Sequence, residues 1–107
     1  MKQNLTQSDV LRILREKQPF LQQAYGVEKL AIFGSFAINK PSTRSDIDII
    51  VHLSKPLGYR FFRLAADLEK SLGRKVDLVT YETLQNSMLD PRRSHIANEI
   101  RRTMIYV

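Results

Sequence analysis

The amino-acid sequence predicts a small α/β (α+β) domain in which a mixed β-sheet is packed with helices on one face. Three short segments rich in Ile, Val and Leu show the alternation that is typical of strands. Amphipathic segments with helical spacing lie before, between and after them, in the order helix, strand, strand, helix, strand, helix. Because 107 residues suit one modest core and are too few for two, we expect a single domain over residues 1–107.

The N-terminal quarter predicts two short helices. Ser8 is a suitable N-cap for a helix over residues 8–17, and Pro19 is expected to end this helix and to start a second one over residues 19–25. Gly26 fits the left-handed position that closes such a helix. The apolar face of the first helix consists of Val10, Leu11, Ile13 and Leu14.

Two strands joined by a turn follow. Residues 27–33, "VEKLAIF", predict a strand that ends in buried positions. Residues 45–53, "SDIDIIVHL", predict a stronger strand that is dominated by isoleucine and valine. Residues 34–44 between them contain Pro and Ser, the signals of a turn and a polar connection.

The second half of the chain continues with a helix, a strand and a last helix. Gly73 is expected to end the helix. Asp90 followed by Pro91 predicts the start of the last helix, because proline is favoured at the first helical position. The segment "ETLQNSML" fits neither pattern clearly. The expected ranges are 59–73 for the helix, 74–81 for the strand and about 91–102 for the last helix.

Composition and charge exclude several classes of protein. No apolar run approaches the roughly 20 residues that cross a bilayer, and the N-terminus lacks the apolar region of a secretory signal, so no membrane contact is expected. The chain has no cysteine, which excludes thiolate metal sites and fits a cytoplasmic protein. The net charge of +6 favours polyanionic partners. The basic residues are scattered and form no RNA-binding motif, so nucleic acid is not expected to be the partner.

Three aspartates are the candidate metal ligands of the chain. Asp46 and Asp48 lie two residues apart in a predicted strand, so their side chains project from one face of the sheet, whereas Ile47 and Ile49 point to the other. Asp77 interrupts the third predicted strand in the same way. If these strands are neighbours, the three carboxylates converge, and such close like charges are tolerable only with a strong cation between them. Mg²⁺ fits best, because it prefers oxygen ligands and keeps phosphates in its shell.

Gly34 and Ser35 provide a matching element at the end of the first strand. Because glycine has no Cβ, Gly34 lets backbone N–H groups approach a phosphate, and the Ser35 hydroxyl can donate to that phosphate. A phosphate cradle and a group of carboxylates on adjacent strands predict metal-dependent nucleotidyl transfer. Two metal ions would activate the attacking hydroxyl and steady the pyrophosphate leaving group.

The two histidines add little to this predicted site. His52 shares the aspartate face by alternation, but a single histidine without cysteines is more often structural than a metal ligand. His95 lies in the last predicted helix, where we expect it to be exposed.

The motifs "FGSFA", "SDIDIIV" and "KVDLV", in this order and spacing, resemble those of the minimal nucleotidyltransferase family within the DNA-polymerase-β-like superfamily. The resemblance covers most of the chain and implies a nucleotidyltransferase palm without a separate substrate-binding domain. It also implies that Gly34 and Ser35 bind the triphosphate and that Asp46 and Asp48 hold two Mg²⁺ ions. Asp77 would then help one metal and act as the base for the incoming hydroxyl.

The same resemblance implies a protein partner. Many family members are encoded beside a small helical protein of the HEPN type, and the pair is similar to a toxin–antitoxin module. In such modules the nucleotidyltransferase is the antitoxin, and it moves AMP from ATP to a tyrosine hydroxyl of the HEPN toxin. The alternative is a catalytically weak or inactive antitoxin that neutralises its partner by binding alone.

The sequence departs from the family pattern in the turn after Ser35. Where relatives often carry arginine and glycine, this chain has Ile38 and Asn39. Asparagine tolerates the left-handed backbone that a glycine would supply, so the turn itself is expected to survive. Lys40 or Arg44 could restore the positive charge that the arginine brings in relatives.

Overall fold

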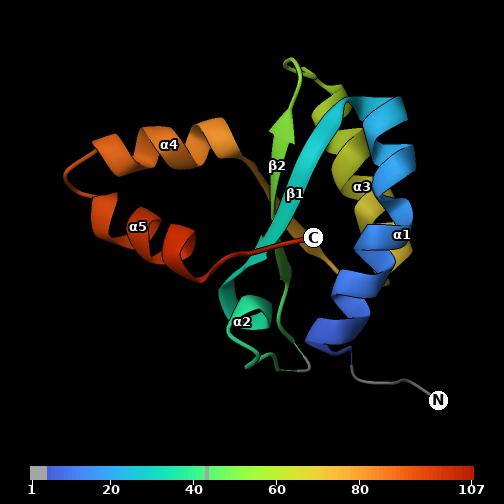
Figure 1. Cartoon of the computed structure of the whole chain (residues 1–107), viewed down its shortest axis with the longest axis horizontal. Coiled ribbons are helices and arrows are strands. Elements are labelled where there is room, and N and C mark those ends of the chain that lie inside the picture. The colour runs from blue at the N-terminus through green and yellow to red at the C-terminus, as the bar shows by residue number, and fades with distance from the viewer. Residues whose placement is uncertain (1–4, 43) are drawn as a thin grey trace.

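The computed structural model of the chain describes residues 5–42 and 44–107, and in this part of the chain four strands form one sheet with five helices around it (Figure 1). None of the helices described is both long and apolar enough to cross a membrane. In chain order the elements are α1 (Gln7–Tyr25), β1 (Val27–Phe33), α2 (Gly34–Ala37), β2 (Ile47–Leu53), α3 (Arg60–Leu72), β3 (Val76–Thr80), α4 (Tyr81–Leu89), α5 (Ser94–Thr103) and β4 (Ile105–Tyr106).

The sheet is mixed, as the sequence predicts. Its strand order is β3-β2-β1-β4, in which β1 runs antiparallel to β2 and β4, whereas β2 and β3 are parallel. Helix α3 makes the crossover that two parallel neighbours require. The register places Phe33 of β1 and Asp77 of β3 on either side of Asp48 in β2. The end of β1 and the beginnings of β2 and β3 therefore meet at one point of the sheet.

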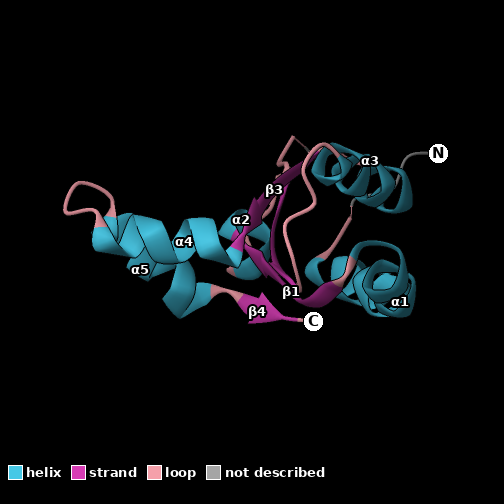
Figure 2. Ribbon diagram, turned by 90° about the horizontal axis from the view of Figure 1, so that it is seen from above, coloured by secondary structure: helices cyan, strands magenta, loops and turns pink. Residues whose placement is uncertain are grey.

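The sheet separates a large apolar core from a small one (Figure 2). Helices α1 and α3 cover one face, where Ile47, Ile49 and Val51 are fully buried. On the other face α4 and α5 pack around Phe33 and Ile50 and extend away from the sheet. The predicted layer of helices on one face corresponds to α1 and α3, and the pair α4 and α5 adds a second, smaller layer.

Helix α1 is continuous, so the predicted break at Pro19 is wrong. Val10, Leu14, Leu21 and Tyr25 lie on one buried stripe that runs through both halves of the helix. Burial of this stripe in the large core outweighs the roughly 3 kcal/mol that a proline costs inside a helix.

The N-cap of α1 is Thr6 and not Ser8 as predicted. The Asp9 N–H donates to the Thr6 hydroxyl at 3.1 Å, and the Thr6 N–H donates to the Asp9 carboxylate at 3.1 Å. This reciprocal arrangement satisfies two backbone donors at once, which favours Thr6 over a cap two residues later.

The last helix begins later than the sequence predicts. The N–H groups of Arg93 and Ser94 donate to the Asp90 carbonyl at 2.9 and 2.8 Å. Asp90 and Pro91 therefore belong to a turn between α4 and α5, and α5 starts at Ser94. The ambiguous segment 82–89 is helical and forms most of α4.

Because Pro19 is exposed and removes a backbone donor from the middle of α1, we expect Pro19→Ala to stabilise the protein. The gain in the free energy of unfolding should be about 1–3 kcal/mol, measured by urea denaturation. Gln22→Ala, at another exposed position of α1, is the control and should change stability by less than about 0.5 kcal/mol. A loss of stability in Pro19→Ala would contradict this account of α1.

Candidate active site

Asp48 lies at the centre of the candidate site. It is the second residue of β2, and the parallel register places Asp77 of β3 directly opposite. Its side chain leaves the sheet on the face opposite to the buried Ile47 and Ile49, as the alternation predicts. Asp46 lies exposed just before β2 begins. The structure thus brings Asp48 and Asp77 together on neighbouring strands, with Asp46 beside them.

The electrostatic environment of Asp48 is unfavourable to its charge. The pKa of this carboxyl is raised to about 6, first by burial and then by the negative charges of Asp77 and Asp46. At neutral pH the carboxylate is therefore ionised where both its burial and its neighbours oppose the charge. A cation placed among these carboxylates would relieve the repulsion.

Gly34 is held against the Asp48 carboxylate. It follows the last residue of β1, begins α2, and has a φ of +69°, a left-handed conformation that favours glycine. A Cβ at Gly34 would lie 2.1 Å from Asp48 Oδ2. The absence of a side chain is therefore required twice, by the backbone conformation and by the close approach of the carboxylate. Ser35 follows as the second residue of α2 and is half-buried.

Helix α2 is fixed in place by Gln7, a residue that lies outside all of the sequence motifs. The Gln7 side-chain amide donates to the carbonyls of Phe36 and Ala37 at 2.9 and 3.0 Å. Phe36 itself is fully buried in the large core. Because one side chain of α1 satisfies two carbonyls at the end of α2, the turn that carries Gly34 and Ser35 cannot move independently of the core. No local sequence signal identifies Gln7, since its partners lie about thirty residues away.

Arg74 connects the turns that precede β2 and β3. Its guanidinium donates to the carbonyls of Ser42 and Ser45 at 3.3 and 3.4 Å, which are long contacts, and it lies 5.6 Å from the centroid of the Phe36 ring. Ser45 directly precedes Asp46. Arg74 therefore helps to position the segment that contains Asp46 and Asp48, although in the sequence it is one of many scattered basic residues.

The turn after α2 survives the departure from the family pattern. Asn39 has a φ of +60°, so it adopts the left-handed conformation expected of it. The Lys40 N–H then donates to the Ser35 carbonyl at 2.8 Å, which closes the turn. The side chains of Lys40 and Arg44 are exposed.

The donor set of the site consists of oxygen atoms. Among residues 5–42 and 44–107, no group of three Asp, Glu, His or Cys side chains lies close enough to hold a metal ion by itself. Asp48 and Asp77 supply carboxylates from adjacent strands, and the Asp48 carboxylate lies against the Gly34 backbone. This arrangement fits Mg²⁺, which takes one or two carboxylates and completes its shell with water or phosphate oxygens.

A cavity of about 340 Å³ adjoins the carboxylates on the face covered by α4 and α5. Phe33, Asp77 and Arg93 are among the residues that line it. Phe33 directly precedes Gly34, and Asp77 is the partner of Asp48. This cavity therefore borders the candidate site at Asp77, and we call it the Asp77 cavity.

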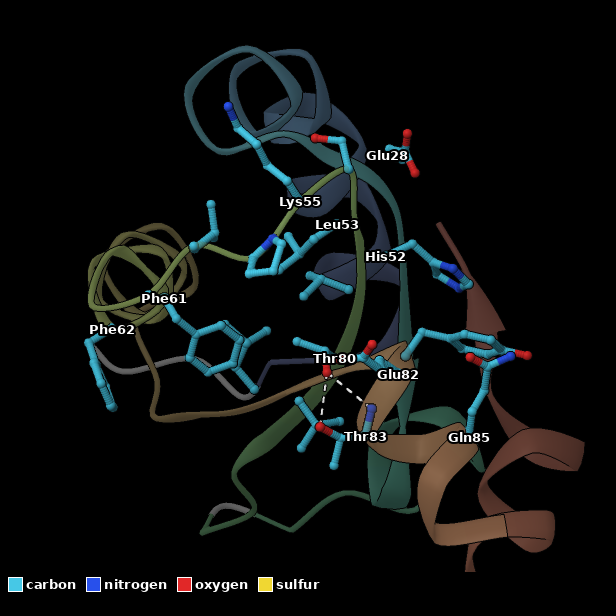
Figure 3. Close-up of a pocket in the computed structure, with 18 residues that line it drawn as sticks. Glu28, His52, Leu53, Lys55, Phe61, Phe62, Thr80, Glu82, Thr83 and Gln85 are labelled. Carbon is cyan, nitrogen blue, oxygen red and sulfur yellow. Dashed lines mark hydrogen bonds between the residues drawn. The ribbon is translucent and has the colours of Figure 1, made fainter. Parts of the chain in front are cut away.

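A second cavity, of about 760 Å³, lies at the opposite end of β2 and β3, where Phe61 of α3 points into it from the side opposite His52 (Figure 3). None of the three aspartates lines it. His52 is hydrogen-bonded to the Tyr106 hydroxyl at 2.8 Å and stacks on Tyr81 with ring centroids 4.1 Å apart. His52 thus ties β4 and α4 to the end of β2, in agreement with a structural role.

Gly34→Ala should destabilise the protein strongly, because the new Cβ meets both a left-handed backbone and the Asp48 carboxylate. Gly58→Ala is a matched control: its φ is +59°, but no described atom lies within 4 Å of the added Cβ. We expect a loss of about 1 kcal/mol in the control and at least about 2 kcal/mol more in Gly34→Ala, measured by urea denaturation. Equal losses in the two variants would contradict the close contact with Asp48.

The pH dependence of stability should report the environment of Asp48. The pKa of the Asp48 carboxyl rises on folding, here to about 6. The stability that this group contributes is fully present below its unfolded pKa and is lost as the pH rises through its folded pKa. In metal-free buffer, Asp48→Asn should therefore stabilise the protein increasingly between about pH 4 and pH 7 and by a constant amount above. Partial solvent screening limits the effect to roughly 1 kcal/mol, or about 5 °C in Tm at pH 7.5.

Thermal unfolding of wild type and Asp48→Asn at pH 4, 5.5 and 7.5 measures this difference. Glu82→Gln, at an exposed position of α4, controls for the general loss of a carboxylate. A difference between wild type and Asp48→Asn that does not depend on pH would contradict the repulsion at this site.

Comparison with known proteins identifies the family. Residues 15–94 match the family described as polymerase beta nucleotidyltransferase. A relative from Methanocaldococcus jannaschii, named "putative protein adenylyltransferase", is 38% identical over 103 residues, which cover 95% of this chain and 98% of the relative. The protein adenylyltransferase MntA of Thermococcus cleftensis is 32% identical over 104 residues, which cover 96% of this chain and 97% of the relative.

Solved structures give the same result. One described as a "putative minimal nucleotidyltransferase" has a TM-score of 0.70 at 27% identity and covers 97% of this chain and 98% of its own. A toxin–antitoxin structure with AMP-PNP has a TM-score of 0.53 at 27% identity and covers 79% of this chain and 64% of its own. Sequence and structure together show that this chain belongs to the polymerase beta nucleotidyltransferase family and is a nucleotidyltransferase.

Proposed function

We propose that this protein is a Mg²⁺-dependent adenylyltransferase that moves AMP from ATP to a tyrosine hydroxyl of a HEPN-type toxin and thereby acts as its antitoxin. The observation that carries the proposal is the approach of the Gly34 backbone to the Asp48 carboxylate, with Asp77 directly opposite Asp48. A turn that can bind phosphates next to paired carboxylates is what the transfer of a nucleotidyl group requires.

Each predicted site residue has a role in this proposal. Gly34 and Ser35 bind the triphosphate, since the backbone N–H groups of this turn can donate to a phosphate and the serine supplies a hydroxyl donor. Asp46 and Asp48 hold the cations together with Asp77. Asp77 is exposed, so an acceptor from another protein can reach it, and it accepts the proton of the incoming hydroxyl.

The transfer balances as one displacement at the α-phosphorus. The tyrosine oxygen forms a bond to the α-phosphorus while the bond from this atom to the oxygen that bridges to the β-phosphate breaks. The hydroxyl proton passes to Asp77, and pyrophosphate leaves with the electron pair of the broken bond. Bound Mg²⁺ supplies the positive charge that lowers the pKa of the hydroxyl and neutralises the leaving group.

The relatives support the choice of ATP and of a protein acceptor. The two relatives compared above are named protein adenylyltransferases, and one similar structure is a toxin–antitoxin pair with AMP-PNP, an analogue of ATP. The HEPN type of the partner follows from the resemblance of the three motifs to the minimal nucleotidyltransferase family. We further propose the cytoplasm as the place of the reaction, because ATP and Mg²⁺ are both supplied there.

Labelled AMP should pass from ATP to the protein encoded by the neighbouring gene when this chain and Mg²⁺ are present. Asp48→Ala and Asp77→Asn should each lower the rate of transfer by about 100-fold or more, because each removes a carboxylate at the reacting centre. Glu82→Gln, an exposed carboxylate on α4 that lines the other cavity, is the control and should keep the rate within about twofold.

Two results would overturn this function. If the wild-type protein transfers no label in the presence of the partner, adenylyl transfer is wrong. If a variant that lacks Asp46, Asp48 and Asp77 still neutralises the toxin in cells, the protein acts by binding alone.

A further inference from the structure

We propose that the free edge of β3 and the cavity of about 760 Å³ beside it dock an extended segment of the acceptor protein, which adds to the sheet as a further strand. We call this surface the β3 groove; it consists of Leu78 and Thr80 of β3 and of Phe61 and Phe62 of α3. The choice of the acceptor as the occupant rests on the proposed function. The groove adds a docking surface for a polypeptide chain to the site of nucleotidyl transfer.

Strand β3 has a hydrogen-bonded neighbour on one side only in the described part of the chain. It is the first strand in the order β3-β2-β1-β4, and it pairs with β2. The Val76 N–H donates to the Glu69 carboxylate of α3 at 3.0 Å, so this N–H points away from β2. Because backbone groups alternate in direction along a strand, the N–H groups of Leu78 and Thr80 also point away from β2.

Glu69 covers the beginning of this edge and leaves its end open. Its carboxylate occupies the outward N–H of Val76. Among residues 5–42 and 44–107, no group accepts a hydrogen bond from the outward N–H groups of Leu78 and Thr80. Such an edge is a template for another strand, and proteins that do not use it cover it or blunt it.

The cavity lies along the open part of the same edge. Leu78 and Thr80 line it, and Phe61 and Phe62 line it from α3 (Figure 3). Phe62 is 74% exposed, although burial of a phenylalanine side chain is favourable by about 1.5–3 kcal/mol. Side chains of an added strand would enter the cavity and cover Phe62.

The chemistry of the groove selects an extended polypeptide as its occupant. Outward backbone groups are matched by the backbone of another chain, and a cavity beside them accepts its alternate side chains. In strand addition the backbone hydrogen bonds supply affinity and the side-chain pockets supply specificity. The β3 groove offers both kinds of contact in one place.

The position of the groove selects the acceptor protein as the source of this segment. Asp77, which is proposed to accept the proton of the incoming hydroxyl, directly precedes Leu78 in β3. A strand rises about 3.3 Å per residue, so a segment paired with Leu78 and Thr80 is held within about 10 Å of Asp77. The added strand therefore keeps the acceptor chain at the reacting carboxylates.

Hydrogen exchange of single backbone amides, followed by NMR, tests the added strand. The wild-type protein is measured alone and in complex with the protein encoded by the neighbouring gene, without ATP. We expect the amides of Leu78 and Thr80 to exchange at least tenfold more slowly in the complex, because they gain hydrogen bonds to the added strand. The Val79 amide already faces β2, so its exchange reports any general change in stability. Unchanged exchange at Leu78 and Thr80 in the complex would overturn the proposal.

Phe62→Ser tests the side-chain contacts of the groove through the steady-state kinetics of transfer to the same partner protein. We expect the KM for the partner to rise at least tenfold and kcat to stay within twofold, because Phe62 contacts the docked segment and not the reacting groups. Phe20→Ser, at a 51% exposed position of α1 that lines neither cavity, is the matched control and should leave both constants within twofold. Equal changes of KM in the two folded variants, or a loss confined to kcat, would overturn the groove.

The outcomes separate this inference from the proposed function. A wild-type protein that protects Leu78 and Thr80 in the complex but transfers no label contradicts adenylyl transfer and retains the added strand. Transfer of label with unchanged exchange at both amides overturns the groove and leaves adenylyl transfer intact. A wild-type protein that neither binds the partner nor transfers label to it contradicts both.

Discussion

The approach of the Gly34 backbone to the Asp48 carboxylate is the constraint on which the candidate site depends. The antiparallel register of β1 and β2 sets Phe33 opposite Asp48, so the residue after Phe33 must pass close to the aspartate. Only glycine fits there, because the position needs both a left-handed φ and the absence of Cβ. The turn for which we propose phosphate binding and the Asp48 carboxylate are therefore positioned by the same pair of strands.

The clustered carboxylates of the site lower the stability of the folded protein. Burial and two neighbouring aspartates oppose the charge of Asp48, yet charged carboxylates are what a divalent cation binds. Hydrogen bonds that involve none of the three aspartates hold this arrangement in place. Gln7 fixes the end of α2, and Arg74 connects the two turns before the carboxylate strands. The repulsion between the carboxylates lowers the stability of the fold, and the packing of the large core offsets this loss.

The two faces of the sheet differ in how completely helices cover them. The face under α1 and α3 holds the large core with Ile47 and Ile49, whereas Asp48, which lies between them in the same strand, points to the other face. The opposite face is only partly covered, and α4 and α5 extend away from it (Figure 2). This partial cover leaves the Asp77 cavity next to the carboxylates. A ligand can thus be held on one face without any disturbance of the core on the other.

The sequence alone determined the three longer strands, the face on which Asp48 lies and the presence of a glycine at the turn, because alternation and backbone preference are local properties. The short strand β4 was not predicted. The sequence also predicted the family, since Gly34, Ser35 and the three aspartates recur at a recognisable spacing. Tertiary structure alone decided that α1 continues through Pro19, because the buried stripe that outweighs the proline is shared with the core. It alone also selected Gln7, Arg74 and Arg93, since each acts on residues or a cavity that the chain brings near only after folding.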